Sequence, residues 1–320
     1  ERGAVVIYLA CDEITSFAAL IRPYLDEIPS HCLTPGDFTR FSEAIAALPA
    51  DFGPRAAAGL LTEIVHPHVI FILDEFDRVS DELVQGDVAT FMKLLSDALA
   101  PVCVILVGIG RTVSAIIGHH NSLRRHMIAI PVRGIDTEYG REIIREGALK
   151  AGLNFTPDAQ EMILSLACGS PYHIRLFCLH SGLEAAKTGT NRVELEKVFA
   201  GLVIAQARWA MFNPAAATVF AEVVKTNSTR FDILTRLARI SATQGYVSTD
   251  LIAQDLPLLT RVEIAVAVRG LEPVLKRTGE DADLFQFEDS LAPQFLLMAM
   301  ARFKAKARHK TPVKTVMEVA

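Results

Sequence analysis

The chain lacks the features that mark several protein classes. Its five cysteines are scattered through 320 residues without a C-x-x-C pair. That spacing argues against a disulfide framework or a cysteine zinc site and predicts reduced thiols in a cytoplasmic protein. No apolar run is long enough to span a bilayer, so we expect no membrane partner. No Ser-His-Asp or Cys-His pattern points to nucleophilic catalysis.

A strong excess of positive charge is also lacking. The sequence has 32 Lys and Arg against 37 Asp and Glu, which gives a net charge of −5. Any contact with nucleic acid must therefore come from a local basic surface. The composition, 51% hydrophobic and 22% charged, is that of a globular protein with room for two or three domains.

The most informative stretch that is present runs from Val69 to Glu75. Five apolar residues, Val69–Leu73, are followed by Asp74 and Glu75. Such a short unbroken run predicts a strand buried on both faces of a parallel sheet. Acids at its C-terminal end lie where open α/β sheets bind ligands. A carboxylate pair there suits a magnesium ion and water activation, although the two acids could simply cap a strand.

The first 134 residues alternate between strand and helix patterns. Further strands are predicted at 4–10, 102–107 and 127–132, with helical stretches at 14–25, 36–66, 81–99 and 113–117. This alternation predicts a parallel, doubly wound sheet with helices on both faces.

The remainder of the chain is mostly helical. Four helices are expected at 137–151, 157–167, 171–186 and 193–209, and four more at 214–224, 231–243, 249–255 and 261–274. A hairpin, 274–276 with 284–287, then follows, and helices followed by a hairpin are typical of a winged helix. We expect domains at 1–134, 135–209 and 210–303, then a basic tail at 304–320.

This order of motifs resembles AAA+/STAND P-loop ATPases with a C-terminal winged helix, in the group of initiator-like and transposition-helper ATPases of bacteria and archaea. The resemblance rests on five segments. They are Leu73–Asp77 as a Walker B motif, 104–110 as the sensor-1 strand, 122–125 with 128–131 as the segment that carries a trans-acting arginine, Gly169–Pro171 as the lid GxP motif, and 284–289 as the last wing strand.

The resemblance implies a role for each matching residue. Asp74 would hold Mg²⁺ and Glu75 would activate the water that attacks ATP. Arg125 would contact the γ-phosphate bound by a neighbour in a homo-oligomer, because its guanidinium is always charged and donates two parallel bonds. The remaining nucleotide contacts would come from Thr112, the polar residue nearest to the sensor-1 strand, and from Pro171 and Arg175 in the lid.

Two departures from the family pattern keep a second function open. No G-x-x-x-x-G-K-[ST] loop occurs in the 320 residues, so the phosphate cradle cannot be assigned. Because Glu1 lies directly before a predicted core strand, we expect this chain to be a fragment. The position of the family's lid arginine is held by Tyr172. The chain is thus either an ATP-binding switch that hydrolyses ATP to ADP and phosphate, or a non-hydrolysing scaffold or DNA-binding regulator.

The winged helix also leaves two partners open, double-stranded DNA and another protein. Its expected recognition helix, 261–274, is apolar except for Arg261 and Arg269. Such a helix is unusual in a major groove, where arginine and amide side chains read base edges. Lys276 and Arg277 on the wing could reach phosphates. The GxP segment has a plainer reading too, as an inter-helix turn with proline at the first helical position.

Overall fold

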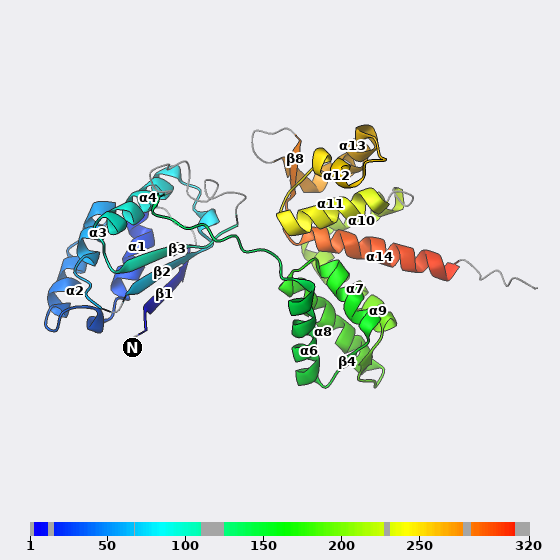
Figure 1. The fold of residues 1–320 in the computed structure, drawn as a ribbon, viewed down its shortest axis with the longest axis horizontal. Helices are drawn as coiled ribbons and strands as arrows, with labels where there is room; N and C mark the ends of the chain where they lie inside the picture. Colours follow the sequence, from blue (N-terminus) through cyan, green and yellow to red (C-terminus); the bar gives the residue numbers. More distant parts are fainter. Residues whose placement is uncertain are drawn as a thin grey trace, which may run out of the picture. The chain divides into compact units, whose positions relative to one another are not determined.

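The computed structural model describes residues 3–11, 16–66, 68–109, 125–226, 231–277 and 283–310, without the side chains of 306–310. The chain forms two compact units, residues 1–131 and 132–320 (Figure 1). Within the described ranges, no helix has both the length and the apolar character needed to cross a membrane.

The first unit is built on a parallel sheet of three described strands, as the apolar runs predict. The strands lie in the order β1 (Val5–Ala10), β2 (Val69–Asp74) and β3 (Val102–Leu106). Between them come four helices, α1 (Phe17–Asp26), α2 (Phe38–Ala46), α3 (Pro54–Leu61) and α4 (Glu82–Asp97). Short 3₁₀ turns lie at Ser30–Cys32 and Phe76–Arg78.

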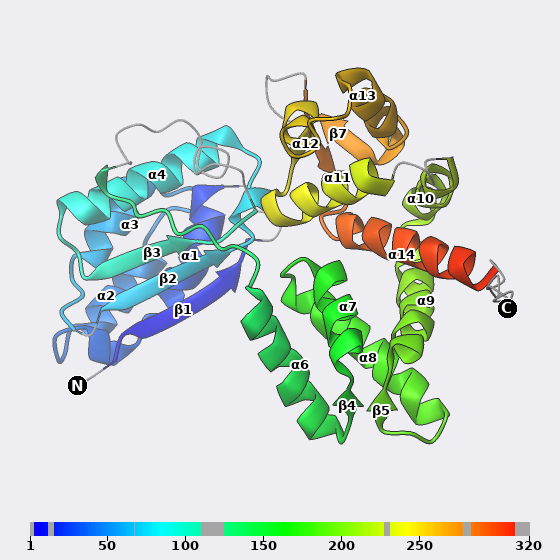
Figure 2. The same ribbon diagram turned by 45° about the vertical axis from the view of Figure 1, so that its right-hand side comes forward.

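The described helices cover one face of this sheet. Phe71 on β2 is fully buried there, with its ring centroid 5.0 Å from that of Tyr24 on α1. Figure 2 looks onto the opposite face, where Val6 and Tyr8 are 55% and 57% exposed and Ile105 is 40% exposed. The strands expected at 4–10, 69–73 and 102–107 and the α/β class are confirmed. The expected cover on both faces is not seen among the described residues, so one face of β1 and β3 stays open.

The strand predicted at 127–132 is wrong. This segment has no strand geometry, and Ile128, Ile130 and Val132 are 81–94% exposed. The alternation of apolar residues does favour a strand, but a strand also needs a neighbour to pair its peptide groups. No such neighbour occurs in the described part of the chain. The helix predicted at 113–117 lies outside the described residues.

The second unit begins with the four predicted helices. They are α6 (Thr137–Ala151), α7 (Pro157–Ala167), α8 (Pro171–Lys187) and α9 (Leu195–Phe212). Asp136 caps α6, and proline opens both α7 and α8, as the sequence signals predict. Two parallel strands, β4 (Asn154–Phe155) and β5 (Arg192–Val193), were not predicted, because two residues are too few to show a period.

The expected helices and hairpin of a winged helix follow. The helices are α10 (Pro214–Thr226), α11 (Phe231–Gln244), α12 (Thr249–Asp255) and α13 (Arg261–Arg269). The strands β6 (Val247–Ser248), β7 (Leu275–Arg277) and β8 (Leu284–Phe287) form a sheet in the order β6-β8-β7. Helix α14 (Ala292–Lys310) then extends into the region predicted as a basic tail.

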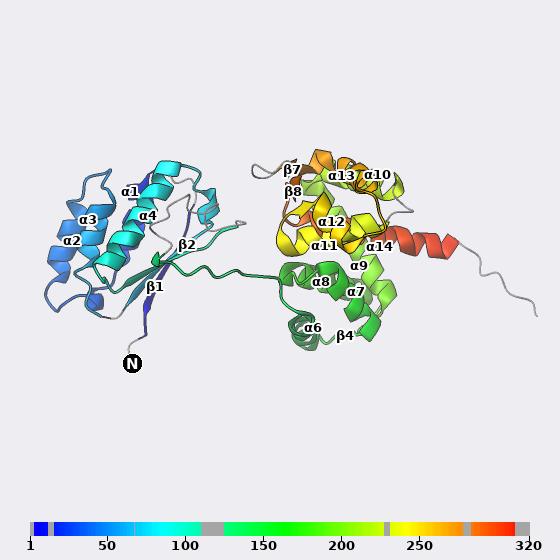
Figure 3. The same cartoon turned by 45° about the horizontal axis from the view of Figure 1, so that its top comes forward.

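The helical segment and the winged helix share one hydrophobic core. Trp209 on α9 stacks on Phe220 of α10 and on Phe295 of α14, with ring centroids 5.5 and 4.6 Å apart. Arg239 on α11 donates to Ser165 Oγ on α7 over 2.7 Å. Figure 3 shows α14 close to α7 and α9, in agreement with the contacts between these elements. The second unit is therefore packed as one body from α6 to α14.

Candidate nucleotide site

The candidate site begins at the turn after β2. Phe76 N donates to Val107 O over 2.8 Å and Val107 N donates to Leu73 O over 2.9 Å, which ties the turn to the end of β3. Glu75 lies in the left-handed region with φ 56°. A non-glycine residue is strained there and persists only where its surroundings fix it. These backbone hydrogen bonds supply that support. They hold Asp74 and Glu75 side by side at the C-terminal end of β2, which we call the β2 edge.

Asp74 already has partners for both carboxylate oxygens. Its Oδ1 accepts a hydrogen bond from Glu75 N over 2.8 Å, and its Oδ2 accepts one from the hydroxyl of Tyr8. This hydrogen bond raises the pKa of Tyr8, and desolvation and the nearby negative charge act in the same direction. Sequence reasoning missed Tyr8. The available signal was its place in β1, opposite Ile72 and so diagonal to Asp74 on the open face.

Glu75 and Asp77, the other acids at the β2 edge, also have partners. Glu75 Oε2 pairs with Arg78 Nη1 over 2.9 Å, and both side chains are about half exposed. Such a pair adds little to stability, so Glu75 can exchange it at small cost. Asp77 Oδ1 accepts from Ile109 N over 2.9 Å, and a Cβ at Gly108 would lie 2.9 Å from that oxygen. Asp77 therefore fixes the sensor-1-like turn against the β2 edge.

These donors suit a magnesium ion that shares its shell with another ligand. Mg²⁺ prefers six oxygen ligands, keeps several waters and is often held by one or two carboxylates plus substrate phosphates. Within the described residues, no group of three His, Cys, Asp or Glu side chains could hold a metal by itself. Asp74 can serve such an ion once Tyr8 releases Oδ2, and Glu75 can then act on a water beside it.

The structure does not bring the remaining predicted residues to this edge. Arg125 is exposed in the first unit, and no described contact joins it to Asp74 or Glu75. Thr112 lies outside the described residues. Pro171 and Arg175 belong to the second unit, where both are exposed on the first turns of α8. Their proposed contacts with nucleotide remain predictions.

The winged helix shows a mixed surface at the predicted DNA contacts. Arg261 Nη2 forms an ion pair with Asp250 over 2.9 Å, and the Arg277 guanidinium lies over the Phe285 ring, 5.8 Å from its centroid. On α13, Val262 and Val266 are 71% and 57% exposed. Lys276 is exposed and Arg269 lies at the end of the helix. The apolar character expected from the sequence therefore reaches the surface of α13.

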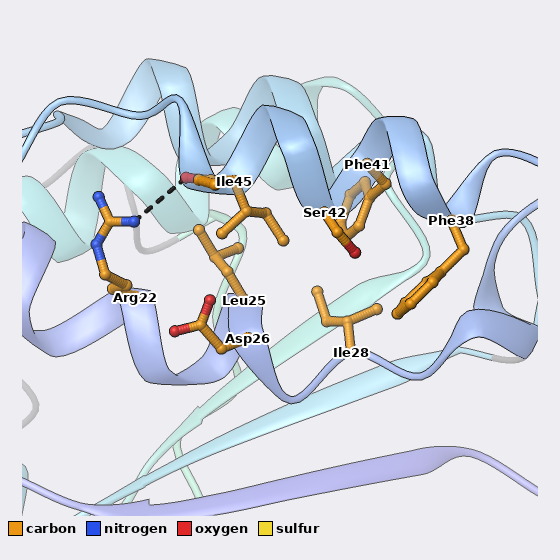
Figure 4. A pocket seen from close by; sticks show the side chains of 9 residues that line it. Arg22, Leu25, Asp26, Ile28, Phe38, Phe41, Ser42 and Ile45 are labelled. Atoms are coloured by element: carbon orange, nitrogen blue, oxygen red, sulfur yellow. Dashed lines mark hydrogen bonds between the residues drawn. The ribbon is translucent and has the colours of Figure 1, made fainter.

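A separate hollow of about 130 Å³ lies between α1 and α2 (Figure 4). Arg22 borders it and donates to the carbonyls of Ile45, Leu48 and Pro49 over 3.0–3.2 Å. These bonds satisfy carbonyls at and after the end of α2 and place the guanidinium over the Phe52 ring, 5.0 Å from its centroid. We assign Arg22 a structural role, because its donors are directed at the backbone.

Comparisons with known proteins concern the fold. No protein-family profile and no curated protein match the chain. Among solved structures, the *Aeropyrum pernix* ORC1 protein in complex with DNA matches with 14% identity and a TM-score of 0.42, over 96% of this chain and 79% of that chain. Cdc6p from *Pyrobaculum aerophilum* matches with 14% identity and a TM-score of 0.40, over 95% and 80%. The *Thermotoga maritima* RuvB Holliday junction branch migration motor matches with 15% identity and a TM-score of 0.38, over 80% and 83%.

Identities of 14–15% and TM-scores of 0.38–0.42 are too low for these neighbours to assign this chain to a class. The parallel sheet, the four-helix segment and the winged helix described above make up the architecture that the sequence resemblance implies. The activity of this chain must be argued from its own residues.

Proposed function

We propose that the protein is an ATP-binding switch in which Mg²⁺·ATP at the β2 edge favours one arrangement of the winged-helix domain. The observation that carries the proposal is the placement of Asp74 and Glu75 together at the C-terminal end of a parallel strand. Asp74 would hold the ion and Glu75 would orient the attacking water in hydrolysis to ADP and phosphate. A ligand shifts such a switch only by binding one state better than the other.

The proposal requires a phosphate-binding loop, because carboxylates alone repel the nucleotide's phosphates. Among the described strands none pairs with the outer edge of β3, and Tyr8 and Ile105 are exposed on the open face, so a further strand and helix could supply one there. Arg125 would serve a neighbouring copy, and Pro171 with Arg175 would contact the nucleotide from the second unit. Thr112 is the candidate polar residue at the sensor-1 turn.

Equilibrium binding of ATP with Mg²⁺ tests this function on the present chain and on the complete reading frame of its gene. A product of that reading frame that contains a phosphate-binding loop should bind ATP, and the present chain, which has no G-x-x-x-x-G-K-[ST] sequence, should bind far more weakly. Glu75→Gln should bind ATP but lose hydrolysis, and Asp74→Asn should lose the dependence on Mg²⁺. Glu82→Gln, an exposed acid at the start of α4, is the matched control and should behave as wild type. Absence of ATP binding in both proteins would contradict the proposal.

The alternative is a scaffold or DNA-binding regulator that does not use nucleotide. The exposed Val262 and Val266 on α13 favour a protein partner over a DNA groove, because a major-groove helix presents polar side chains to base edges. A salt titration separates the two. Binding to double-stranded DNA that falls steeply with salt would indicate phosphate contacts by Lys276 and Arg277. No binding at low salt would leave a protein partner.

A further inference from the structure

The linker into the second unit is fixed to the turn that precedes α8. Ile135 N donates to Gly169 O over 2.9 Å. A Cβ at Gly169 would lie 2.7 Å from Ile135 O, and its φ of +78° also disfavours a side chain. Because the obstructing atom belongs to the backbone, it cannot rotate away as the end of a side chain could. The position of the linker and the position of this turn are therefore set together.

The same turn is packed into the winged helix on its inner side. His173, fully buried in the first turn of α8, places Nδ1 2.9 Å from Ser170 Oγ and its ring 5.5 Å from that of Phe295 on α14. Phe295 stacks on Trp209 at 4.6 Å. Trp209 Nε1 in turn donates to Asp289 Oδ2 over 2.8 Å.

Asp289 closes the series of contacts because it also fixes the start of α14. Its Oδ1 accepts from Leu291 N over 2.9 Å, and its carbonyl accepts from Ala292 N over 3.0 Å. The outer side of the α8 turns is different, since Pro171, Tyr172 and Arg175 are exposed there. One short segment therefore presents an open face to ligands and a buried face to the winged helix.

We propose that the turn from Gly169 to His173 is a joint that transmits the position of the linker to the winged helix through Phe295 and Trp209. The contacts form a contiguous series from Ile135 to Asp289. Packed cores respond to a displacement by shifting as a body, because they have little free volume to absorb it. The joint itself needs no nucleotide. Its use by a bound nucleotide, through Pro171 or Arg175, rests on the proposed function.

The chain carries its own reporter for this joint, because Trp209 is its one tryptophan. Gly169→Ala should displace the turn and loosen the Phe295–Trp209 stack. We expect a red shift of the tryptophan emission and stronger quenching by acrylamide, although residue 169 is forty positions from the fluorophore in sequence. His173→Ala should cause the same shift. Adding it to Gly169→Ala should then change the emission little, since both act through one series of contacts.

Gly189→Ala is the matched control. Gly189 lies in the same unit with φ +69°, but a Cβ there would meet nothing within 4 Å. The substitution therefore imposes a similar backbone strain without a clash, and we expect the emission and quenching of Trp209 to stay as in wild type. Gly134→Ala offers a milder probe of the joint, because its Cβ would lie 3.1 Å from Gly169 O.

Two results would contradict the proposal that this turn acts as a joint. One is a Gly169→Ala protein with wild-type circular dichroism and unchanged Trp209 emission. The other is an equal shift in Gly189→Ala, which would indicate general loosening. If Gly169→Ala does not fold, the same criteria apply to Gly134→Ala. Failure to bind ATP would contradict the proposed function and leave these fluorescence results unaffected.

Discussion

The two turns of functional interest are built in opposite ways. At the β2 edge, Glu75 takes the left-handed conformation and its partners are half exposed. Before α8, Cys168 and Gly169 take that conformation, and the next turn buries His173 completely. The first turn can exchange its polar contacts with water or a ligand at little cost. The second turn is packed into the hydrophobic core, so a displacement of this turn must also displace the residues that it contacts. One arrangement suits binding and the other suits transmission.

The largest effect is expected from Phe295→Ala, which tests whether the second unit unfolds cooperatively as one body. Phe295→Ala removes a buried ring from the Trp209 stack and should lower the free energy of unfolding of that unit by about 3–5 kcal/mol. Chemical denaturation followed by Trp209 fluorescence measures this. Phe91→Ala, an equally buried ring in the first unit, is the control. It should leave the Trp209 transition in place, and a common shift would mean that the units unfold together.

The next largest effect is a loss of stability of the second unit in acid. Burial lowers the pKa of His173 to about 4 from an ordinary 6.5, against the smaller opposing effects of the Leu291 backbone and the Asp289 charge. Between pH 6.5 and pH 4, His173 therefore binds a proton in the unfolded chain but not in the folded chain. The stabilisation is complete above pH 6.5 and is lost as pH falls toward 4, by roughly 3 kcal/mol.

Denaturation of the second unit at a series of pH values checks this prediction. His173→Phe should reduce the slope between pH 6.5 and 4. It should not remove the slope entirely, because burial lowers the pKa of His180 as well. An unchanged slope in His173→Phe would show that the acid sensitivity comes from other groups.

A smaller effect should appear in the first unit. Leu99 is 89% exposed and has φ 51° just after the end of α4. Glycine is preferred at this position because it has no Cβ to strain. Leu99→Gly should raise the free energy of unfolding of the first unit by about 0.5–1 kcal/mol. Thermal unfolding by circular dichroism measures this, and destabilisation would show that the Leu99 side chain makes a needed contact.

An effect of similar size concerns the exchange of contacts at the β2 edge. Tyr8→Phe removes the hydroxyl that occupies Asp74 Oδ2 and should strengthen Mn²⁺ binding by about 0.5–1 kcal/mol. Water-proton relaxation with Mn²⁺ alone measures this, with Tyr139→Phe as the exposed control in the other unit. Weaker binding in Tyr8→Phe would mean that the phenol orients the carboxylate for the ion.

Most helices and strands could be predicted from the sequence because the signals for them are local. The apolar run 69–73 became β2, and Asp81, Asp136 and Pro171 start the helices that they predict. Asp74 and Glu75 lie together because they are adjacent in sequence at the end of β2. Their actual contacts could not be predicted, since Tyr8 reaches Asp74 from a position 66 residues away.

The sequence by itself determined the order of strands, helices and wing, because periodicity, caps and turn residues act within a few positions. Only the tertiary structure decided which apolar residues are buried. Ile130 has the pattern of a strand but pairs with no strand in the described part of the chain. Trp209, Phe220 and Phe295 join segments that look separate in sequence into one core. Burial and strand pairing depend on partners far along the chain, and a local pattern does not identify them.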